Sequence, residues 1–206
     1  MKKVFVIAGM ALSVVLTSCG GDKASSNATA SAESTPSTKF GIDTSTSVLK
    51  WKGSKSEEDF HVGSVKFKSG SLSAQGTENI TGEFVVDMAS MKVEDEKMKQ
   101  EERDMLKGHL SEVEFFNTGK FNEVKVKVNG YKDGKLSSVL TVLGKEMKQD
   151  IPVKISNDGS KFTITGTFDV DFKELGIEGL AVNEKKPEET IKSVVNFDLN
   201  LVLNKQ

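Results

Sequence analysis

The chain has 206 residues, of which 36% are hydrophobic and 28% charged, and its 28 basic side chains are balanced by 30 acidic ones. This balance speaks against a nucleic-acid partner, which requires a basic surface, and the charge content speaks against an integral membrane protein. With one cysteine and two histidines, the chain has no internal disulfide and few groups for metal binding or acid–base catalysis.

The first 18 residues have the layout of a secretory signal. Lys2 and Lys3 precede an apolar run over residues 4–16, and polar residues follow at once. The run ends at Cys19 in the sequence Leu-Thr-Ser-Cys, which resembles the bacterial lipobox, where cleavage leaves the cysteine as an acylated N-terminus. We therefore predict a lipoprotein signal peptide at 1–18 and lipidation of Cys19. The alternative is an ordinary signal peptide with an incidental cysteine.

Residues 19–39 are predicted to form a flexible tether. They consist mainly of Ser, Ala, Thr and Gly, with almost no bulky side chain to bury. Several acyl chains on one residue give stable membrane attachment, whereas a single chain is marginal. We therefore expect a protein of the bacterial cell envelope that is anchored to a membrane through Cys19, with the outer membrane as the first choice. Its body, residues 40–206, would lie in the periplasm or at the cell surface.

In the body, apolar and polar residues alternate, and Gly, Asn and Asp interrupt the pattern at short intervals. This pattern predicts antiparallel strands joined by tight turns. The turn at residues 131–134 (Tyr-Lys-Asp-Gly) indicates a hairpin. Strands are expected at residues 48–52, 62–72, 80–86, 124–128, 136–143, 151–155, 162–172 and 193–203.

Roughly eight strands suffice to close an antiparallel barrel around side chains or one elongated ligand, and closure removes exposed edges. A two-sheet sandwich would produce the same alternation and is the competing architecture. Residues 93–110 break the alternation, because they are rich in Glu, Lys, Met and Leu. They predict a helix inserted between strands, whose charged face is interpreted as solvated rather than partner-binding.

Phe115, Phe116 and Phe121 follow this helix, and here the sequence resembles the YceI-like family, lipocalin-like barrel proteins of bacteria. Lys145–Lys148 stands where this family has a short turn. Further segments carry the likeness: Ile42-Asp43, Ser47, Trp51-Lys52-Gly53, His61-Val62-Gly63, Gly82-Glu83-Phe84, Arg103-Asp104-Met105-Leu106 and the residues around Gly144.

The resemblance implies an all-β fold, an eight-stranded antiparallel lipocalin-like barrel with one inserted helix. It also implies that the interior binds a long apolar chain, such as an isoprenoid quinone or another polyisoprenoid, or a fatty-acid-like amphiphile. Apolar inward residues are compatible with such a cavity and equally with an ordinary core. The expected cavity residues are Trp51, Phe67, Phe84, Phe162, Phe168 and Phe197, with Phe115, Phe116 and Phe121 at the mouth.

Chemistry-bearing residues are sparse. His61 and His109 have Glu57, Glu58, Asp59 and Glu112 as nearby carboxylates, but the two histidines lie far apart and match no tight metal-ligand motif. His109, near the helix end, is expected to help satisfy the terminal carbonyls. No nucleophile elbow or phosphate-binding loop occurs, so we expect no metal, no resident cofactor and no enzymatic activity.

Two functions from different classes remain. The first is a carrier that sequesters an isoprenoid or fatty-acyl amphiphile inside the barrel. The second is a structural or interaction module with a packed barrel that binds a partner protein or glycan on its surface. Both a monomer and a dimer are compatible with the sequence.

Overall fold

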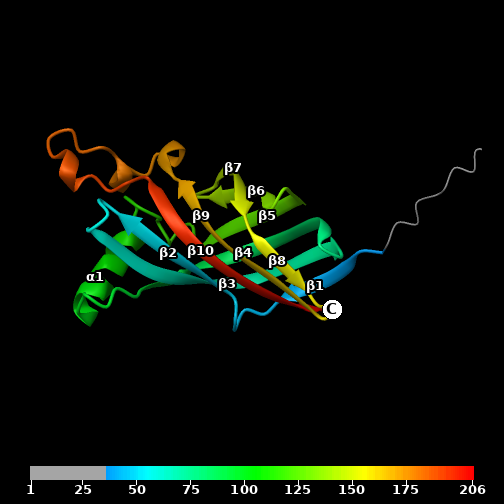
Figure 1. Ribbon diagram of the computed structural model, residues 1–206. Helices are drawn as coiled ribbons and strands as arrows, with labels where there is room; N and C mark the ends of the chain where they lie inside the picture. The colour runs from blue at the N-terminus through cyan, green and yellow to red at the C-terminus, as the bar shows by residue number, and fades with distance from the viewer. Residues whose placement is uncertain (1–35) are drawn as a thin grey trace, which may run out of the picture. The chain divides into compact units, whose positions relative to one another are not determined.

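The computed structural model describes residues 36–206 (Figure 1). The predicted signal peptide, Cys19 and residues 19–35 of the tether lie outside the described residues. No helix within residues 36–206 combines the length and the apolarity needed to cross a membrane.

The described chain is an antiparallel β structure with a single α-helix. The helix is α1 (Gln100–Ser111), and three short 3-10 turns, η1 (Lys173–Leu175), η2 (Glu178–Leu180) and η3 (Pro187–Glu189), follow β9. The strands are β1 (Thr38–Ile42), β2 (Val48–Ser54), β3 (Phe60–Gln75), β4 (Glu78–Val93), β5 (Glu123–Lys132), β6 (Lys135–Val142), β7 (Lys145–Pro152), β8 (Lys154–Asn157), β9 (Lys161–Asp171) and β10 (Val194–Lys205).

One sheet contains all ten strands and curls into a barrel. Its order is β7-β6-β5-β4-β3-β1-β10-β9-β8, and β2 also pairs with both β3 and β10. β1 and β2 therefore share the space between the same two long strands, β1 at one end of the barrel and β2 at the other. On the remaining side, the Gln149 side-chain amide of β7 donates to the Asp169 carbonyl of β9 at 3.3 Å. The predicted all-β barrel with one inserted helix is confirmed.

The strand number differs from the predicted eight for two reasons. β1 has only five residues and was not predicted as a strand. The predicted strand 151–155 is divided between β7 and β8 after Pro152, the last residue of β7, which has no N–H for a ladder. The next residue, Val153, instead donates its N–H to the Gly134 carbonyl at 2.8 Å.

Lys145–Lys148, expected as a turn, forms the first half of β7. The turn lies just before it, at Leu143 and Gly144, whose φ values are 52° and 76°. Two consecutive positive φ values are typical of the tight hairpin turns that fit the twist of a sheet.

The helix begins at Gln100 rather than at residue 93. Val93 is still paired with Gly63 in the β3–β4 ladder, so the strand continues through it. Asp95 then makes a turn, because its carboxylate accepts the Lys97 N–H at 3.0 Å. At the start of the helix, the Lys99 N–H donates to the Glu102 carboxylate at 2.7 Å. This contact gives a partner to a main-chain N–H that has no acceptor within the helix.

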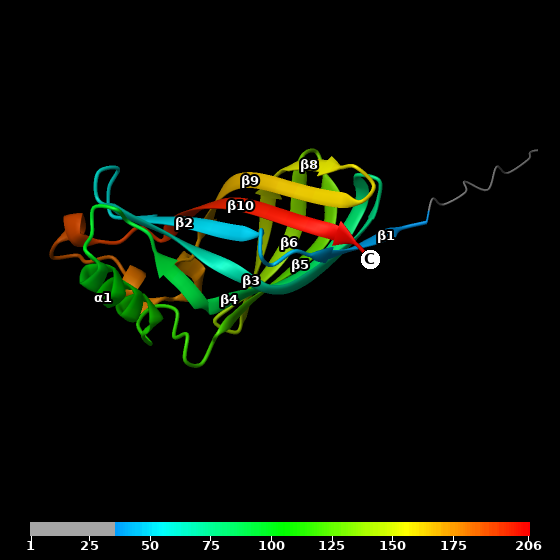
Figure 2. The ribbon, with the colours of Figure 1, turned by 90° about the horizontal axis from the view of Figure 1, so that it is seen from below.

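The two ends of the barrel differ. β1 and the C-terminus lie at one end (Figure 2). Apolar side chains fill the interior there, and we call this the closed end. The hairpin between β2 and β3, α1 and the 3-10 turns lie at the opposite end (Figures 1 and 2). The plug of the closed end consists of Phe40, Leu72, Ala74, Ile80, Phe162 and Leu203, each no more than 2% exposed.

Candidate functional site: an apolar cavity in the barrel

A cavity of about 390 Å³ lies inside the barrel, within the size range of small-molecule sites. Strand residues alternate between inward and outward, so the inward faces of neighbouring strands supply a continuous apolar wall. The aliphatic and methionine part of the wall consists of Leu49, Val65, Val86, Met88, Met91, Val124, Val126, Val128, Leu136, Leu140, Val142, Ile151, Val170, Val195, Leu199 and Leu201.

Seven of the nine predicted aromatic residues line this cavity: Trp51, Phe67, Phe84, Phe115, Phe116, Phe168 and Phe197. The structure brings several of them into direct ring contact. Phe67 and Phe84 meet edge to face at 6.3 Å between ring centroids, and Phe168 stacks on Phe197 at 5.7 Å. Ligand contact by these residues stays a prediction.

Phe162 and Phe121 do not line the cavity, in contrast to expectation. Phe162 faces inward as its strand pattern predicts, but it belongs to the plug, where its ring lies 5.2 Å from that of Phe40. Phe121 lies against the Leu143-Gly144 turn outside the wall, and the Lys120 ammonium is 5.0 Å from its ring. Alternation predicts which side a residue faces, but not its position along the barrel axis.

The cavity opens at the end opposite the plug. Its mouth is formed by α1, the loop that follows it, and the segment 172–193, which contribute Leu106, Leu110, Phe116, Phe172, Leu180 and Ile191 to the lining. The loop and the segment are joined closely, because the Gly179 N–H donates to the Glu114 carbonyl at 2.8 Å. A side chain at Gly179 would come within 2.6 Å of the Phe115 ring, so glycine permits this approach.

Phe172 is a wall residue that was not predicted from the sequence. Its ring lies 5.8 Å from Phe116 and 6.2 Å from Phe197, so it connects the mouth aromatics with those of the barrel wall. Phe172 is the last residue in the apolar alternation of the predicted strand 162–172. This alternation was the sequence feature from which its inward orientation could have been predicted. The aliphatic wall residues also follow the alternation of apolar and polar residues. This alternation does not distinguish the residues of the cavity wall from those of the plug.

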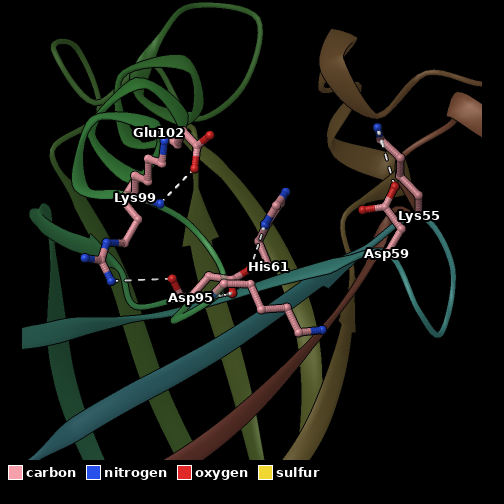
Figure 3. A network of polar contacts seen from close by, with 8 residues as sticks. Lys55, Asp59, His61, Asp95, Lys99 and Glu102 are labelled. Carbon is pink, nitrogen blue, oxygen red and sulfur yellow. Dashed lines mark hydrogen bonds and ion pairs between the residues drawn. The ribbon is translucent and has the colours of Figure 1, made fainter.

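The ionisable groups of the lining lie only at the mouth. They are Lys55, Asp59 and His61 of the β2–β3 hairpin and His109 of α1, and the Ser54 hydroxyl lies beside them. Figure 3 shows the hairpin groups, in which Lys55 and Asp59 form an ion pair at 3.8 Å. The wall deeper in the barrel is apolar.

Asp95 holds His61 at the mouth. The His61 Nδ1 lies 3.1 Å from the Asp95 carboxylate (Figure 3). The Asp95 carbonyl accepts a hydrogen bond from the Arg103 guanidinium at 3.4 Å. The bond to His61, together with the N–H donated by Lys97, holds the pKa of the Asp95 carboxyl below its ordinary value. The carboxylate partner of His61 is thus none of Glu57, Glu58, Asp59 and Glu112, which were considered from the sequence.

The second histidine has a different role. The His109 ring meets the Phe115 ring at 4.8 Å between centroids, and its main-chain carbonyl, not its side chain, accepts the Glu112 N–H at the helix end. Within residues 36–206, no group of three or more His, Cys, Asp or Glu side chains is arranged to hold a metal ion.

Comparison with known proteins assigns this barrel to a family. The family model of the YceI-like domain matches residues 40–203. The chain belongs to the YceI-like family. No match to this chain was found among the curated proteins.

Two solved structures share the fold of this YceI-like protein at low sequence identity. A polyisoprenoid-binding domain from Saccharophagus degradans, implicated in plant cell wall breakdown, is 15% identical, with a TM-score of 0.59 over 81% of this chain and 98% of that one. BcnA of Burkholderia cenocepacia is also 15% identical, with a TM-score of 0.60 over 78% of this chain and 98% of that one. At this identity, the likeness shows the fold.

Proposed function

We propose that this YceI-like protein is a membrane-anchored envelope lipoprotein that binds a long-chain isoprenoid or fatty-acyl amphiphile inside its barrel, as a carrier or sequestering protein without catalysis. The observation that carries the proposal is the apolar cavity of about 390 Å³, plugged at one end and open at the other. A long apolar chain is the kind of ligand whose transfer from water into such a wall is favourable.

The distribution of polar groups supports a head-out orientation of the ligand. Because Lys55, Asp59, His61 and His109 all lie at the mouth, a polar head group would find hydrogen-bond partners only there. A head group placed deeper would lose its hydrogen bonds to water and gain none from the protein. Transfer of an unpaired polar group from water into an apolar environment costs on the order of several kcal/mol. The apolar tail would therefore extend toward the plug.

The similar domain from Saccharophagus degradans is described as polyisoprenoid-binding, which supports an isoprenoid as the first choice of ligand. The apolar wall deep in the barrel does not distinguish an isoprenoid tail from a fatty-acyl tail. A fatty-acyl chain is therefore the second choice of ligand.

The binding proposal is tested with the chain lacking residues 1–19, purified from a bacterial host and measured by native mass spectrometry before and after organic extraction. We expect an added mass that disappears on extraction and matches an isoprenoid or fatty-acyl lipid. Leu140 is a wall residue, and Leu140→Trp would fill the cavity. Thr141→Trp is the matched control, because the next residue of the same strand faces the other side.

We expect Leu140→Trp to remove most of the bound lipid and Thr141→Trp to leave it unchanged. A bare protein mass that stays unchanged after incubation with quinones and fatty acids would contradict the proposal. That result would favour the packed barrel with a surface partner.

The anchor is tested separately. Cys19→Ser removes the only thiol that could be acylated. In cell fractionation we expect the natural chain in the membrane fraction and the variant in the soluble fraction. Retention of Cys19→Ser in the membrane would contradict acylation as the basis of attachment.

A further inference from the structure

The chain enters the barrel at the end that lies opposite the cavity mouth. Thr38, the first residue of β1, pairs with Ala74 near the C-terminal end of β3, whereas the mouth hairpin contains Phe60 at the other end of that strand. β3 has 16 residues, which at about 3.3 Å each correspond to about 50 Å. Figure 2 shows β1 and α1 at opposite ends.

The three most exposed large apolar side chains among residues 36–206 all belong to segments that form the mouth. Met105 of α1 is 75% exposed, Val113 of the following loop 72%, and Val182 of the segment 172–193 70%. We call these three residues the rim. Single exposed apolar residues are ordinary on protein surfaces, but these three all belong to the segments that contribute lining residues at the opening of an apolar cavity.

The predicted tether is shorter than the barrel unless it is stretched. The 18 residues between Cys19 and Thr38 reach at most about 60–65 Å when fully extended. A flexible chain of this length has a mean end-to-end distance of only about 21–25 Å. For the mouth to face the bilayer that holds Cys19, the tether would have to run past the whole barrel and be stretched to about twice its mean end-to-end distance.

We propose that the barrel exchanges its ligand with a lipid bilayer other than the one that holds Cys19, by docking the rim of Met105, Val113 and Val182 on that second bilayer. The inference rests on the proposed function, and it adds the surface and the partner of ligand exchange. A lipid that passes directly from bilayer to cavity through an apolar rim avoids exposure of its tail to water.

The charges near the rim specify the kind of bilayer. Residues 100–114 and 173–192 together carry ten acidic and six basic side chains. This excess of negative charge repels an anionic surface at low salt and has little effect on a neutral one. The rim is therefore suited to a bilayer of zwitterionic phospholipid.

The test uses the full-length acylated protein anchored in donor vesicles of phosphatidylcholine and loaded with a pyrene-labelled fatty acid. Acceptor vesicles of phosphatidylcholine carry a quencher, so loss of pyrene emission reports transfer to the second bilayer. A parallel sample with the quencher in the donor vesicles reports exchange with the anchoring bilayer. We expect transfer to the second bilayer to be at least fivefold faster and to increase with the concentration of acceptor vesicles.

Variants separate the rim from the tether. The double variant Met105→Asp with Val113→Asp should slow transfer to the second bilayer about tenfold without weakening binding of the probe, while Asn204→Asp at the closed end should have no effect. Insertion of about 20 Gly and Ser residues after Ala30 should accelerate exchange with the anchoring bilayer, because the longer tether reaches past the barrel. Acceptor vesicles containing phosphatidylglycerol should receive the probe more slowly at low salt.

Binding of the probe is measured first in each sample, which separates the two proposals. A protein that does not bind the probe overturns the proposed function and this inference together. Bound probe that exchanges equally fast with the anchoring bilayer, or that transfers at an unchanged rate in the double variant, overturns only the inference.

Discussion

Trp51 lies directly opposite Gly63 in the β2–β3 ladder, and its indole covers the space that a side chain at Gly63 would occupy. A Cβ at Gly63 would be 2.4 Å from the Trp51 ring and 1.9 Å from the Lys92 carbonyl of β4. The absence of a side chain at one residue thus positions the only tryptophan of the chain in the cavity wall.

Gly63→Ala is therefore expected to destabilise the barrel. Because the nearest atom belongs to the main chain, rotation of a side chain cannot relieve the clash, and overpacking of this kind costs about 1–3 kcal/mol. Gly53→Ala is the control, since a Cβ there meets nothing within 4 Å, and we expect it to stay within about 0.5 kcal/mol of the parent. Urea unfolding followed by Trp51 fluorescence measures both, and equal stability of the two variants would contradict the packing argument.

The plug and the wall should respond differently to truncation. Phe162 is fully buried in the plug, so Phe162→Ala is expected to lower the free energy of unfolding by about 3–5 kcal/mol. Phe168 borders the cavity and has neighbours on fewer sides, so Phe168→Ala should cost clearly less but reduce lipid binding. Urea unfolding of lipid-free protein and mass spectrometry of loaded protein check the two effects. A larger stability loss in Phe168→Ala would show that the cavity is packed.

The Asp95–His61 pair predicts a dependence of stability on pH. The pKa of Asp95 is lowered in the folded protein, so the carboxylate stabilises the fold above its unfolded pKa of about 3.9, and this contribution is lost as the pH falls through the lowered value. Asp95→Asn should therefore lower the urea midpoint at pH 7, and its difference from the parent should shrink below about pH 4.

Asp59→Asn is the control for this experiment. Its ion pair with Lys55 is exposed and 3.8 Å long, so we expect a change within about 0.5 kcal/mol at either pH. If the effect of Asp95→Asn were the same at pH 7 and pH 3, the charge of Asp95 would not be its cause.

The hairpin between β5 and β6 provides a test of backbone conformation. Asp133 and Gly134 form its turn with φ values of 52° and 76°. Gly134→Ala is expected to cost about 1 kcal/mol, because a residue with a Cβ is strained at positive φ even without a steric neighbour. Gly130→Ala on the adjoining strand also meets nothing within 4 Å and lacks the positive φ, so it should be close to neutral. Thermal unfolding compares the two, and a shift of several degrees is expected for Gly134→Ala alone.

Local patterns in the sequence were sufficient for the class of fold. Alternation of apolar and polar residues reflects one half-buried face of a strand, and the Asp133-Gly134 pair reflects a turn with positive φ, so both could be recognised without tertiary information. β1 was not predicted because it is short. The first half of β7 was not predicted because Met147 is the only partly buried residue among 145–148.

The cavity required the folded barrel. Phe162 and Phe168 occupy equivalent inward positions on β9, yet one is packed against Phe40 in the plug and the other faces the cavity. Their difference depends on how far each lies along the barrel axis and on what the neighbouring strands place beside it, which alternation along one strand does not encode. The contact of His61 with Asp95, 34 residues away, depends in the same way on the pairing of β3 with β4. Sequence patterns report which face of a strand is buried, whereas open space depends on side chains from many strands that meet only after folding.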